Sequence, residues 1–281
     1  MRDSPASPSI DWRIALIGGP DGCISLTGKE RFAAHEPTGE AVPAHDLHAQ
    51  LDQAAGEIGG QVIAWRHHLH SHPELSNRET ATAHTVADHL RSLELDEVRT
   101  GIAGHGVVGV LHGGGDGDRV VALRADIDAL PIKEESGVDF ASTVVDEDYP
   151  GGASPVAHAC GHACHTAMLI GAASVLAPAR DELPGTILFV FQPADEGPPI
   201  DEDGGAVSYF VDKYGGAYLQ LGAQDVELRP DGTMAPEPGG RGIAMNHNPH
   251  FYADDSVLET GVRIHANVAL DHLTGAITAS G

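Results

Sequence analysis

Residues Pro155 to Thr166 read Pro-Val-Ala-His-Ala-Cys-Gly-His-Ala-Cys-His-Thr and lie between a Gly- and Pro-rich segment and an apolar run. Cys160 and His162 are separated only by Gly161, which can adopt backbone angles that other residues avoid. The thiolate and the imidazole can therefore turn toward one cation, and this pair suits zinc, manganese or a similar divalent ion. The alternative is a loop with a free cysteine and surface histidines.

Helical and strand patterns alternate on both sides of this stretch. Apolar residues recur every three or four positions over His45–Leu69, which predicts a long helix. Short continuous apolar runs occupy Val107–Leu111, Val120–Leu123 and Thr186–Phe191, and such runs are typical of strands that are buried on both faces. We therefore predict an α/β fold with a single mixed sheet, largely parallel, and helices on both of its faces.

Two more helices and an N-terminal arm complete the predicted organisation. Ser76 and Glu79 have the spacing of a capping box, which predicts that a helix begins at Ser76. A last helix is predicted from about Ser256 to Leu273, where apolar residues again share one face. Residues 1–43 show little periodicity, so we expect a poorly ordered arm there and one folded domain over residues 44–281.

The composition excludes several classes of protein. The 281 residues include 41 acidic and 16 basic side chains, which give a formal net charge of −25. Such a surface repels phosphate backbones and anionic membranes, so we expect no binding of nucleic acid or membranes. Three cysteines do not suit a disulfide framework. With no signal-peptide pattern and no apolar run of about 18 residues, the sequence predicts a cytoplasmic protein.

Acidic residues follow two of the predicted strands. Asp126 and Asp128 come after one strand, and Asp195 and Glu196 come after another. Ligand sites of α/β folds lie at the carboxyl ends of strands, and a metal-dependent hydrolase needs a carboxylate base beside its water. Of two adjacent acids, one can hold a metal while the other faces the substrate. The alternatives are a buried ion pair between Arg124 and an aspartate, or plain surface acids.

Five motifs occur in series along the chain. They are Arg66-His-His-Leu-His70 with His72-Pro-Glu-Leu-Ser76, Leu123-Arg-Ala-Asp-Ile-Asp-Ala-Leu-Pro-Ile132, His158-Ala-Cys-Gly-His162, Phe191-Gln-Pro-Ala-Asp-Glu-Gly197, and His247-Asn-Pro249. In this order the motifs resemble the N-acyl-amino-acid amidohydrolases, which include hippurate hydrolases, auxin–amino-acid conjugate hydrolases and related metallopeptidases. The resemblance runs from about Val62 to Leu273.

The resemblance implies a fold, a reaction and a set of site residues. The fold is that of a zinc-peptidase catalytic domain, and the reaction is hydrolysis of the amide bond of N-acyl amino acids or small peptides by a metal-activated water. One or two divalent ions per chain, manganese or zinc, are implied. By position, the implied metal ligands are Cys160, His162, Glu196 and His247. Asp195 matches the general base, while Asp126, Asp128 and His165 are expected to support the ligands from behind.

The sequence also departs from the family pattern. The family usually has Glu where this chain has Asp195, and Asp where this chain has Ala163. A lid and dimerisation domain, roughly 100 residues or more, is missing near residues 206–207. We therefore expect no lid-mediated dimer, and a metal position that has lost a ligand could be filled by His250. The alternatives are an impaired or inactive lidless descendant that keeps the fold and part of the metal site, and a partner-binding module.

Overall fold

The computed structural model describes the chain except for residues 1–43, 198–215, 218, 220, 229–233 and 278–281. The predicted N-terminal arm and the predicted joint near residues 206–207 therefore lie outside the described residues. The described elements, in chain order, are α1 (Ala44–Ser71), α2 (Thr80–Ser92), β1 (Glu97–Ile102), β2 (Gly106–His112), β3 (Gly115–Asp126), β4 (Val145–Asp146), β5 (Ser154–Pro155), α3 (His162–Leu176), η1 (Arg180–Glu182), β6 (Pro184–Gln192), β7 (Val226–Leu228), β8 (Met234–Pro236), η2 (Asp255–Val257) and α5 (Leu258–Thr274).

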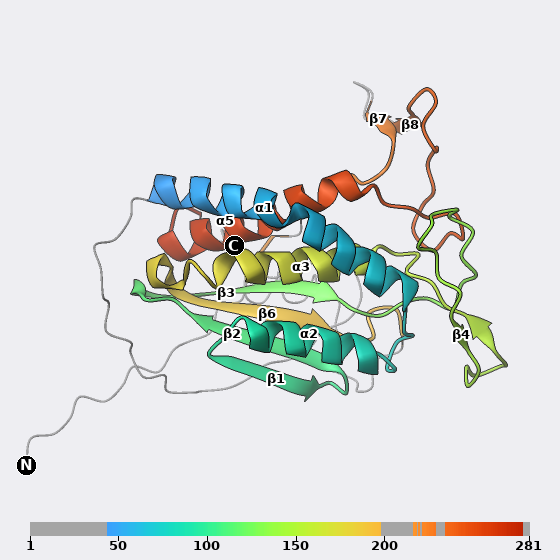
Figure 1. Ribbon diagram of the computed structural model, residues 1–281, viewed down its shortest axis with the longest axis horizontal. Coiled ribbons are helices and arrows are strands. Elements are labelled where there is room, and N and C mark those ends of the chain that lie inside the picture. The colour runs from blue at the N-terminus through green and yellow to red at the C-terminus, as the bar shows by residue number, and fades with distance from the viewer. Residues whose placement is uncertain (1–43, 198–215, 218, 220, 229–233, 278–281) are drawn as a thin grey trace, which may run out of the picture.

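The main sheet has four strands in the order β1-β2-β6-β3 (Figure 1). A single mixed sheet is confirmed, but the prediction that it is largely parallel is wrong for the described strands. The β1–β2 and β2–β6 pairs are antiparallel, and only β3 and β6 run parallel. The short turn at residues 103–105 forces β1 and β2 into a hairpin, whereas α3 lies in the connection from β3 to β6 and allows parallel pairing.

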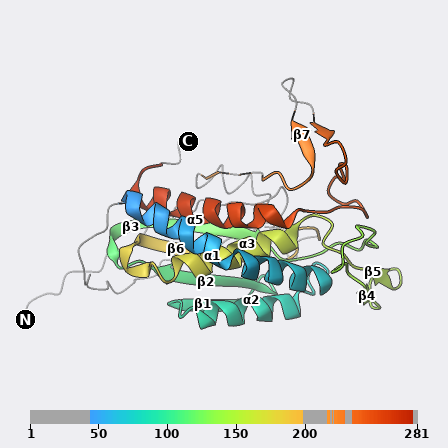
Figure 2. The same ribbon diagram turned by 45° about the horizontal axis from the view of Figure 1, so that its top comes forward.

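One apolar core joins this sheet to the four described α-helices (Figure 2). It contains strand residues that point to one face, such as Val121, Leu123 and Phe189, together with residues of α1, α2, α3 and α5. The alternating residues, such as Ala122 and Val190, are buried too, which confirms that these strands are shielded on both faces. Within the described ranges no α-helix joins that second side, so helices there stay a prediction.

Close packing between α1, α3 and α5 fixes the position of α3. Gly171 of α3 faces Val62 of α1 and Val262 of α5, and a side chain at this position would press against both valines. Gly261 of α5 lies against Met168 of α3 in the same way. The three helices can therefore approach one another closely, and α3 lies firmly between its neighbours.

The predicted capping box is wrong, because both of its side chains bind elsewhere. Helix α2 begins at Thr80, and the carboxylate of Glu74 accepts hydrogen bonds from the amides of Ala81 at 3.0 Å and Thr82 at 2.7 Å. Ser76 instead donates to Asp128, and Glu79 accepts from the amide of residue 194. Both side chains therefore bind buried groups that are distant in the sequence and do not cap α2.

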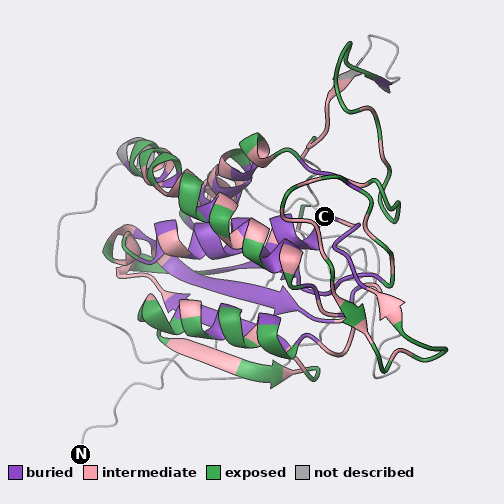
Figure 3. Ribbon diagram, turned by 45° about the vertical axis from the view of Figure 1, so that its right-hand side comes forward, coloured by how far each residue is buried: buried purple, intermediate pink, exposed green. Residues whose placement is uncertain are grey.

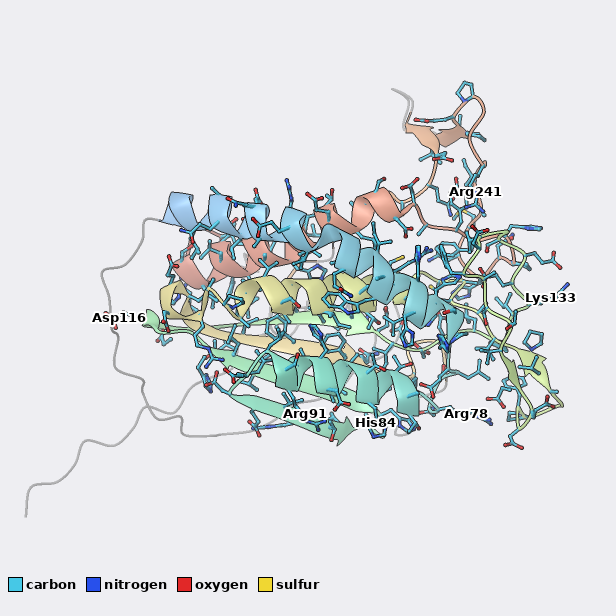
Figure 4. All side chains as sticks on the ribbon, in the orientation of Figure 1. Arg78, His84, Arg91, Asp116, Lys133 and Arg241 are labelled. Atoms are coloured by element: carbon cyan, nitrogen blue, oxygen red, sulfur yellow. The ribbon has the colours of Figure 1, made fainter. Side chains whose placement is uncertain are left out.

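The carboxyl ends of β3 and β6 and the start of α3 meet at one end of the molecule (Figure 1). Asp116, near the start of β3, lies at the opposite end from the loop residues Lys133 and Arg241 (Figure 4). β6 is buried from residue 185 onward and β3 from Val120 onward, whereas most residues of the loop at 131–154 are intermediate or exposed (Figure 3). None of the helices that the structure describes is long and apolar enough to cross a membrane.

Candidate metal centre

Register and local backbone shape bring the predicted site residues together. Asp126 at the end of β3 lies beside Gln192 at the end of β6, so the acidic segments after both strands begin at the same level. Gly161 has a φ of +94°, and α3 begins at the next residue. The glycine turn predicted from the sequence therefore exists, and it points Cys160 and His162 toward the ends of the two strands.

The imidazole of His162 is buried and is held from one side. Its Nδ1 lies 2.9 Å from the carbonyl oxygen of Asp128 and 3.1 Å from the Oδ1 of the same residue. Its Nε2 faces the carboxylates of Glu196 at 3.5 Å, Asp126 at 3.6 Å and Asp195 at 3.7 Å. These three distances exceed an ordinary hydrogen bond, so acceptor oxygens converge on an imidazole nitrogen without binding it directly.

Glu196 joins His162 to a second group of donors. One ligand atom each from His162, Asp195 and Glu196 lie within 4.8 Å of one another, and the same holds for Cys160, Glu196 and His247. Glu196 Oε1 lies 3.0 Å from Nε2 of His247. Glu196 belongs to both groups, so its carboxylate could bind one ion or contribute to a close pair of ions.

The residues present fit a divalent metal ion by their chemistry. Thiolate, imidazole and carboxylate are the ligands of zinc, and imidazole and carboxylate also suit manganese. The carboxylate of Asp128 behind His162 orients the ring as such carboxylates do behind metal-binding histidines. In addition, Asn246 lies 3.4 Å from the sulfur of Cys160 and can donate a hydrogen bond to it. The residues that could hold an ion are thus Cys160, His162, Glu196 and His247.

Crowded charges shift the pKa values of this centre. Although burial opposes charging, the carboxylates of Asp126 and Asp128 hold the pKa of His162 well above its usual value. Burial likewise opposes the charge of Asp126, but His162, His165 and Arg124 hold its pKa well below the usual range. A protonated His162 thus compensates the carboxylates when no ion is bound, and a metal must displace this proton.

Asp195 lies at the inner side of the centre. Its Oδ1 accepts from Arg124, and Gln192 Nε2 lies 3.4 Å away. Burial raises the pKa of Asp195 to about 6, and the charge of Asp126 adds to this effect, although Arg124 opposes it. The predicted alternative of a buried Arg–Asp pair is therefore present, because Arg124 also contacts Asp126 at 3.1 Å. The pair and the candidate base belong to the same cluster.

Two further predicted residues have different positions. His165 Nδ1 lies 2.7 Å from Oδ1 of Asp126, and one ligand atom each from His165, Asp126 and His162 also lie within 4.8 Å of one another, so the supporting role of His165 stays a prediction. His250 instead faces Glu135, whose carbonyl oxygen lies 2.9 Å from its Nδ1. His250 is in none of the three donor groups found among the described residues. The structure therefore gives no support to the idea that His250 replaces a missing ligand.

The sequence interpretation missed three residues at this site. Ser76 donates to Oδ2 of Asp128 at 2.6 Å, Glu79 accepts from the turn before Asp195, and Asn246 contacts the sulfur of Cys160. The sequence predicts a capping box from Ser76 and Glu79 and assigns them no role at the site. Their place in or beside the His72–Ser76 motif is the signal that could have pointed to the site.

Comparisons with known proteins agree with the motif order. The model of peptidase family M20/M25/M40 matches residues 122–232, which include Cys160, His162, Asp195 and Glu196 but not His247. An N-acyl-L-amino acid amidohydrolase of Geobacillus stearothermophilus is 44% identical over 151 residues, which are 52% of this chain and 37% of that protein. Thermostable carboxypeptidase 2 of Saccharolobus solfataricus is 42% identical over 152 residues, which are 54% of this chain and 36% of that protein.

A solved structure gives the same result. The crystal structure of a protein named as an aminohydrolase, from methicillin-resistant Staphylococcus aureus, is 32% identical, with a TM-score of 0.50. The similarity covers 65% of this chain and 46% of that one. The chain thus spans little more than a third of the length of the two curated relatives and about half of this structure. The resemblance to the amidohydrolases is therefore confirmed, and residues 122–232 match the model of peptidase family M20/M25/M40.

Proposed function

We propose that this chain is a metal-dependent hydrolase that cleaves the amide bond of N-acyl amino acids or small peptides. The observation that carries the proposal is the sharing of Glu196 by two adjacent groups of donor atoms. Thiol, imidazole and carboxylate groups are the ligand types of zinc sites, and a metal ion held by such groups can activate water for hydrolysis.

The proposed ligands are Cys160, His162, Glu196 and His247, and the proposed cofactor is one or two ions of manganese or zinc. An ion bound there would polarise the substrate carbonyl and lower the pKa of a bound water toward 7. Asp128 keeps the ring of His162 in place through its Nδ1, and His165 does the same for Asp126. These supports keep the donor atoms in position before a substrate enters.

Asp195 is the proposed base. In the reaction it accepts a proton from the attacking water at Oδ2, the oxygen that does not bind Arg124, and returns the proton to the nitrogen of the leaving amine. Its side chain is one methylene shorter than the glutamate usual in the family. A misplacement of about 1 Å can cost on the order of 10²-fold in rate, so we expect slow turnover.

The relatives support the substrate class. The Geobacillus relative bears the name of an N-acyl-L-amino acid amidohydrolase, and its identity with this chain is 44%. Residues 44–281 are then the catalytic domain, without the lid that the family inserts near residues 206–207. We also propose that the chain lacks the lid-mediated dimer, which light scattering on the purified protein tests.

Turnover assays test the proposed reaction. The protein is incubated with hippurate and a panel of N-acetyl amino acids, with and without added manganese or zinc, and release of the free amino acid is measured. Asp195→Asn should lower kcat by about 10²- to 10⁴-fold, the usual contribution of a general base. His250→Ala is the matched control, since this exposed ring faces Glu135, and its rate should equal that of the wild type. Turnover that survives Asp195→Asn would exclude the proposed base.

One observation favours the alternative of an impaired descendant. Oδ1 of Asp195 is held by the buried guanidinium of Arg124, which also binds Asp126 and Gln192. A base fixed in this way has little freedom to move a proton between water and substrate. Metal binding by the purified protein without hydrolysis of any tested amide would support this alternative, and metal-dependent turnover would exclude it.

A further inference from the structure

The turn at residues 193–197 carries Asp195 and Glu196 of the candidate centre, and three contacts hold this turn. The amide of Ala194 donates to Oε1 of Glu79 at 2.7 Å. The amide of Glu196 donates to Oδ2 of Asp128 at 2.9 Å. Gly197 lies so close to Ser76 that a side chain at position 197 would overlap it. The direction of both carboxylates therefore depends on how firmly this turn is held.

Ala194 has an unusual backbone for its residue type. Its φ is +56°, in the left-handed region, which glycine adopts readily and alanine disfavours. Such a conformation persists only where the surroundings enforce it, and it is common at functional sites. If Ala194 relaxed to a negative φ, the backbone on its carboxyl side would rotate, and Asp195 and Glu196 would leave the centre.

Glu79 is the group that enforces this conformation. Its side chain is fully buried, at 0% exposure, and Oε2 has no hydrogen-bond partner among the described residues. Burying a carboxyl group with so few partners destabilises the fold. Glu79 does not offset this cost in stability by capping α2, because Glu74 already accepts hydrogen bonds from the amides of Ala81 and Thr82. The backbone amides of Asn77 and of Glu79 itself also lie near this carboxyl group, but its hydrogen bond from the amide of Ala194 is the contact that reaches the turn.

We propose that Glu79 is a positioning residue whose carboxyl oxygen holds Ala194 in the left-handed conformation and thereby directs Asp195 and Glu196 into the metal centre. The consequence for the metal rests on the proposed function, but the hold on the turn does not. Holding Ala194 requires a side chain long enough to place an acceptor oxygen at its amide, and it does not require a negative charge. Gln at position 79 keeps that reach, whereas Asp keeps the charge and is one methylene too short.

Residue-resolved hydrogen exchange on the metal-free protein tests the hold directly. In Glu79→Asp and Glu79→Ala, exchange of the Ala194 amide should accelerate by about 10-fold or more, since local opening no longer breaks this bond. Glu79→Gln should exchange at the wild-type rate. Glu74→Ala is the matched control, because it should accelerate the amides of residues 81 and 82 and leave Ala194 unchanged. If Glu79→Ala fails to fold, the exchange rate of the Ala194 amide in Glu79→Asp tests the proposal on its own.

Cobalt binding, followed by absorption spectroscopy, tests the consequence for the centre. Glu79→Asp should weaken cobalt binding by about 10- to 100-fold, the usual effect of losing an outer support, and should alter the visible bands. Glu79→Gln and Glu74→Ala should match the wild type. Unchanged Ala194 exchange in Glu79→Asp, or equal loss in Glu79→Gln, would overturn the proposal. Wild-type protein that binds no cobalt, with the exchange pattern as expected, would refute the metal site and leave the hold by Glu79 intact.

Discussion

His162 and His247, the two histidines of the candidate centre, are held in opposite ways. His162 is 2% exposed at the start of α3, and Asp128 fixes its ring from behind. The side chain of His247 is 52% exposed on a loop, its amide donates to the carbonyl of Ala159, and among the described residues its ring contacts Glu196 alone. One half of the centre is therefore built into the core, and the other half is attached to it.

The attached half depends on a second loop. Glu135 donates its amide to the carbonyl of Pro249 at 2.7 Å, and the neighbouring Glu134 binds His70 of α1 at 2.8 Å. The segment that carries His247 is thus tied to α1 through residues 134 and 135. Two histidines of one candidate site can therefore differ greatly in how firmly they are held before a metal binds. Substitutions far from the centre should disturb His247 on its loop more than His162.

The largest expected effect comes from removing the histidine of the built-in half. Losing a residue that only supports a ligand can weaken metal binding by up to about 100-fold. His162→Ala should weaken metal binding by more than this, whereas His247→Ala should weaken it by about 10-fold. His162→Ala should also lower the free energy of unfolding of the metal-free protein by about 3 kcal/mol, because buried carboxylates lose a cation. Calorimetric titration with zinc and denaturant unfolding measure both. Equal losses in the two variants would remove the distinction between the halves.

A smaller effect is expected at Glu134, whose side chain is 4% exposed. Burial opposes its charge, but hydrogen bonds from His70 and Ser136 hold its pKa below the ordinary value of 4.5. A lowered folded pKa means that the carboxylate stabilises the protein above pH 4.5 and loses this contribution as the pH falls through the folded pKa. Glu134→Gln should therefore cost about 1–3 kcal/mol at pH 7.

Denaturant unfolding from pH 7 to pH 3 checks this expectation. The difference between the wild type and Glu134→Gln should shrink below pH 4.5. Lys133→Ala is the matched control on the same loop, because this exposed side chain should contribute almost nothing to stability. A difference that stays constant with pH would show that the charge of Glu134 is not the source of its contribution.

The smallest effect is expected at Asn246, which lies beside the sulfur of Cys160. Asn246→Ala removes one weak hydrogen bond at an exposed position and should lower zinc affinity by only about threefold, within the usual value of one neutral hydrogen bond. Competition with a chelator measures this change. A loss comparable to that of His247→Ala would show that the loop half is more tightly organised than its exposure indicates.

The sequence predicted most elements that have a strong local pattern. The helix over His45–Leu69 and the last helix near Ser256–Leu273 are confirmed as α1 and α5, because their apolar periodicity reflects the face they bury. Strand β1 was missed, since Glu97–Ile102 has no continuous apolar run and lies at the edge of the sheet. The direction of the strands could not be predicted, because it depends on which distant strands become neighbours.

The candidate centre shows the same division. The spacing of Cys160 and His162 predicts their convergence, because one glycine turn controls both. The contact of Glu79 with Ala194 spans 115 positions and could not be found from spacing. In this candidate site, short-range patterns predict the possible ligands, while contacts such as that of Glu79 with Ala194 become visible only in the fold.

Strand β6 fills the gap between β2 and β3, although these two strands follow each other in the sequence. During synthesis, a chain that has not yet reached Pro184 exposes two unpaired strand edges that face each other, which invites pairing with another chain. Asp195 and Glu196 follow directly after the strand that closes this gap. Completion of the sheet therefore brings these two acids to the end of β3 that carries Asp126, whereas His247 and α5 come later in the chain, so a metal added to nascent chains should bind fully only after His247 has been synthesised.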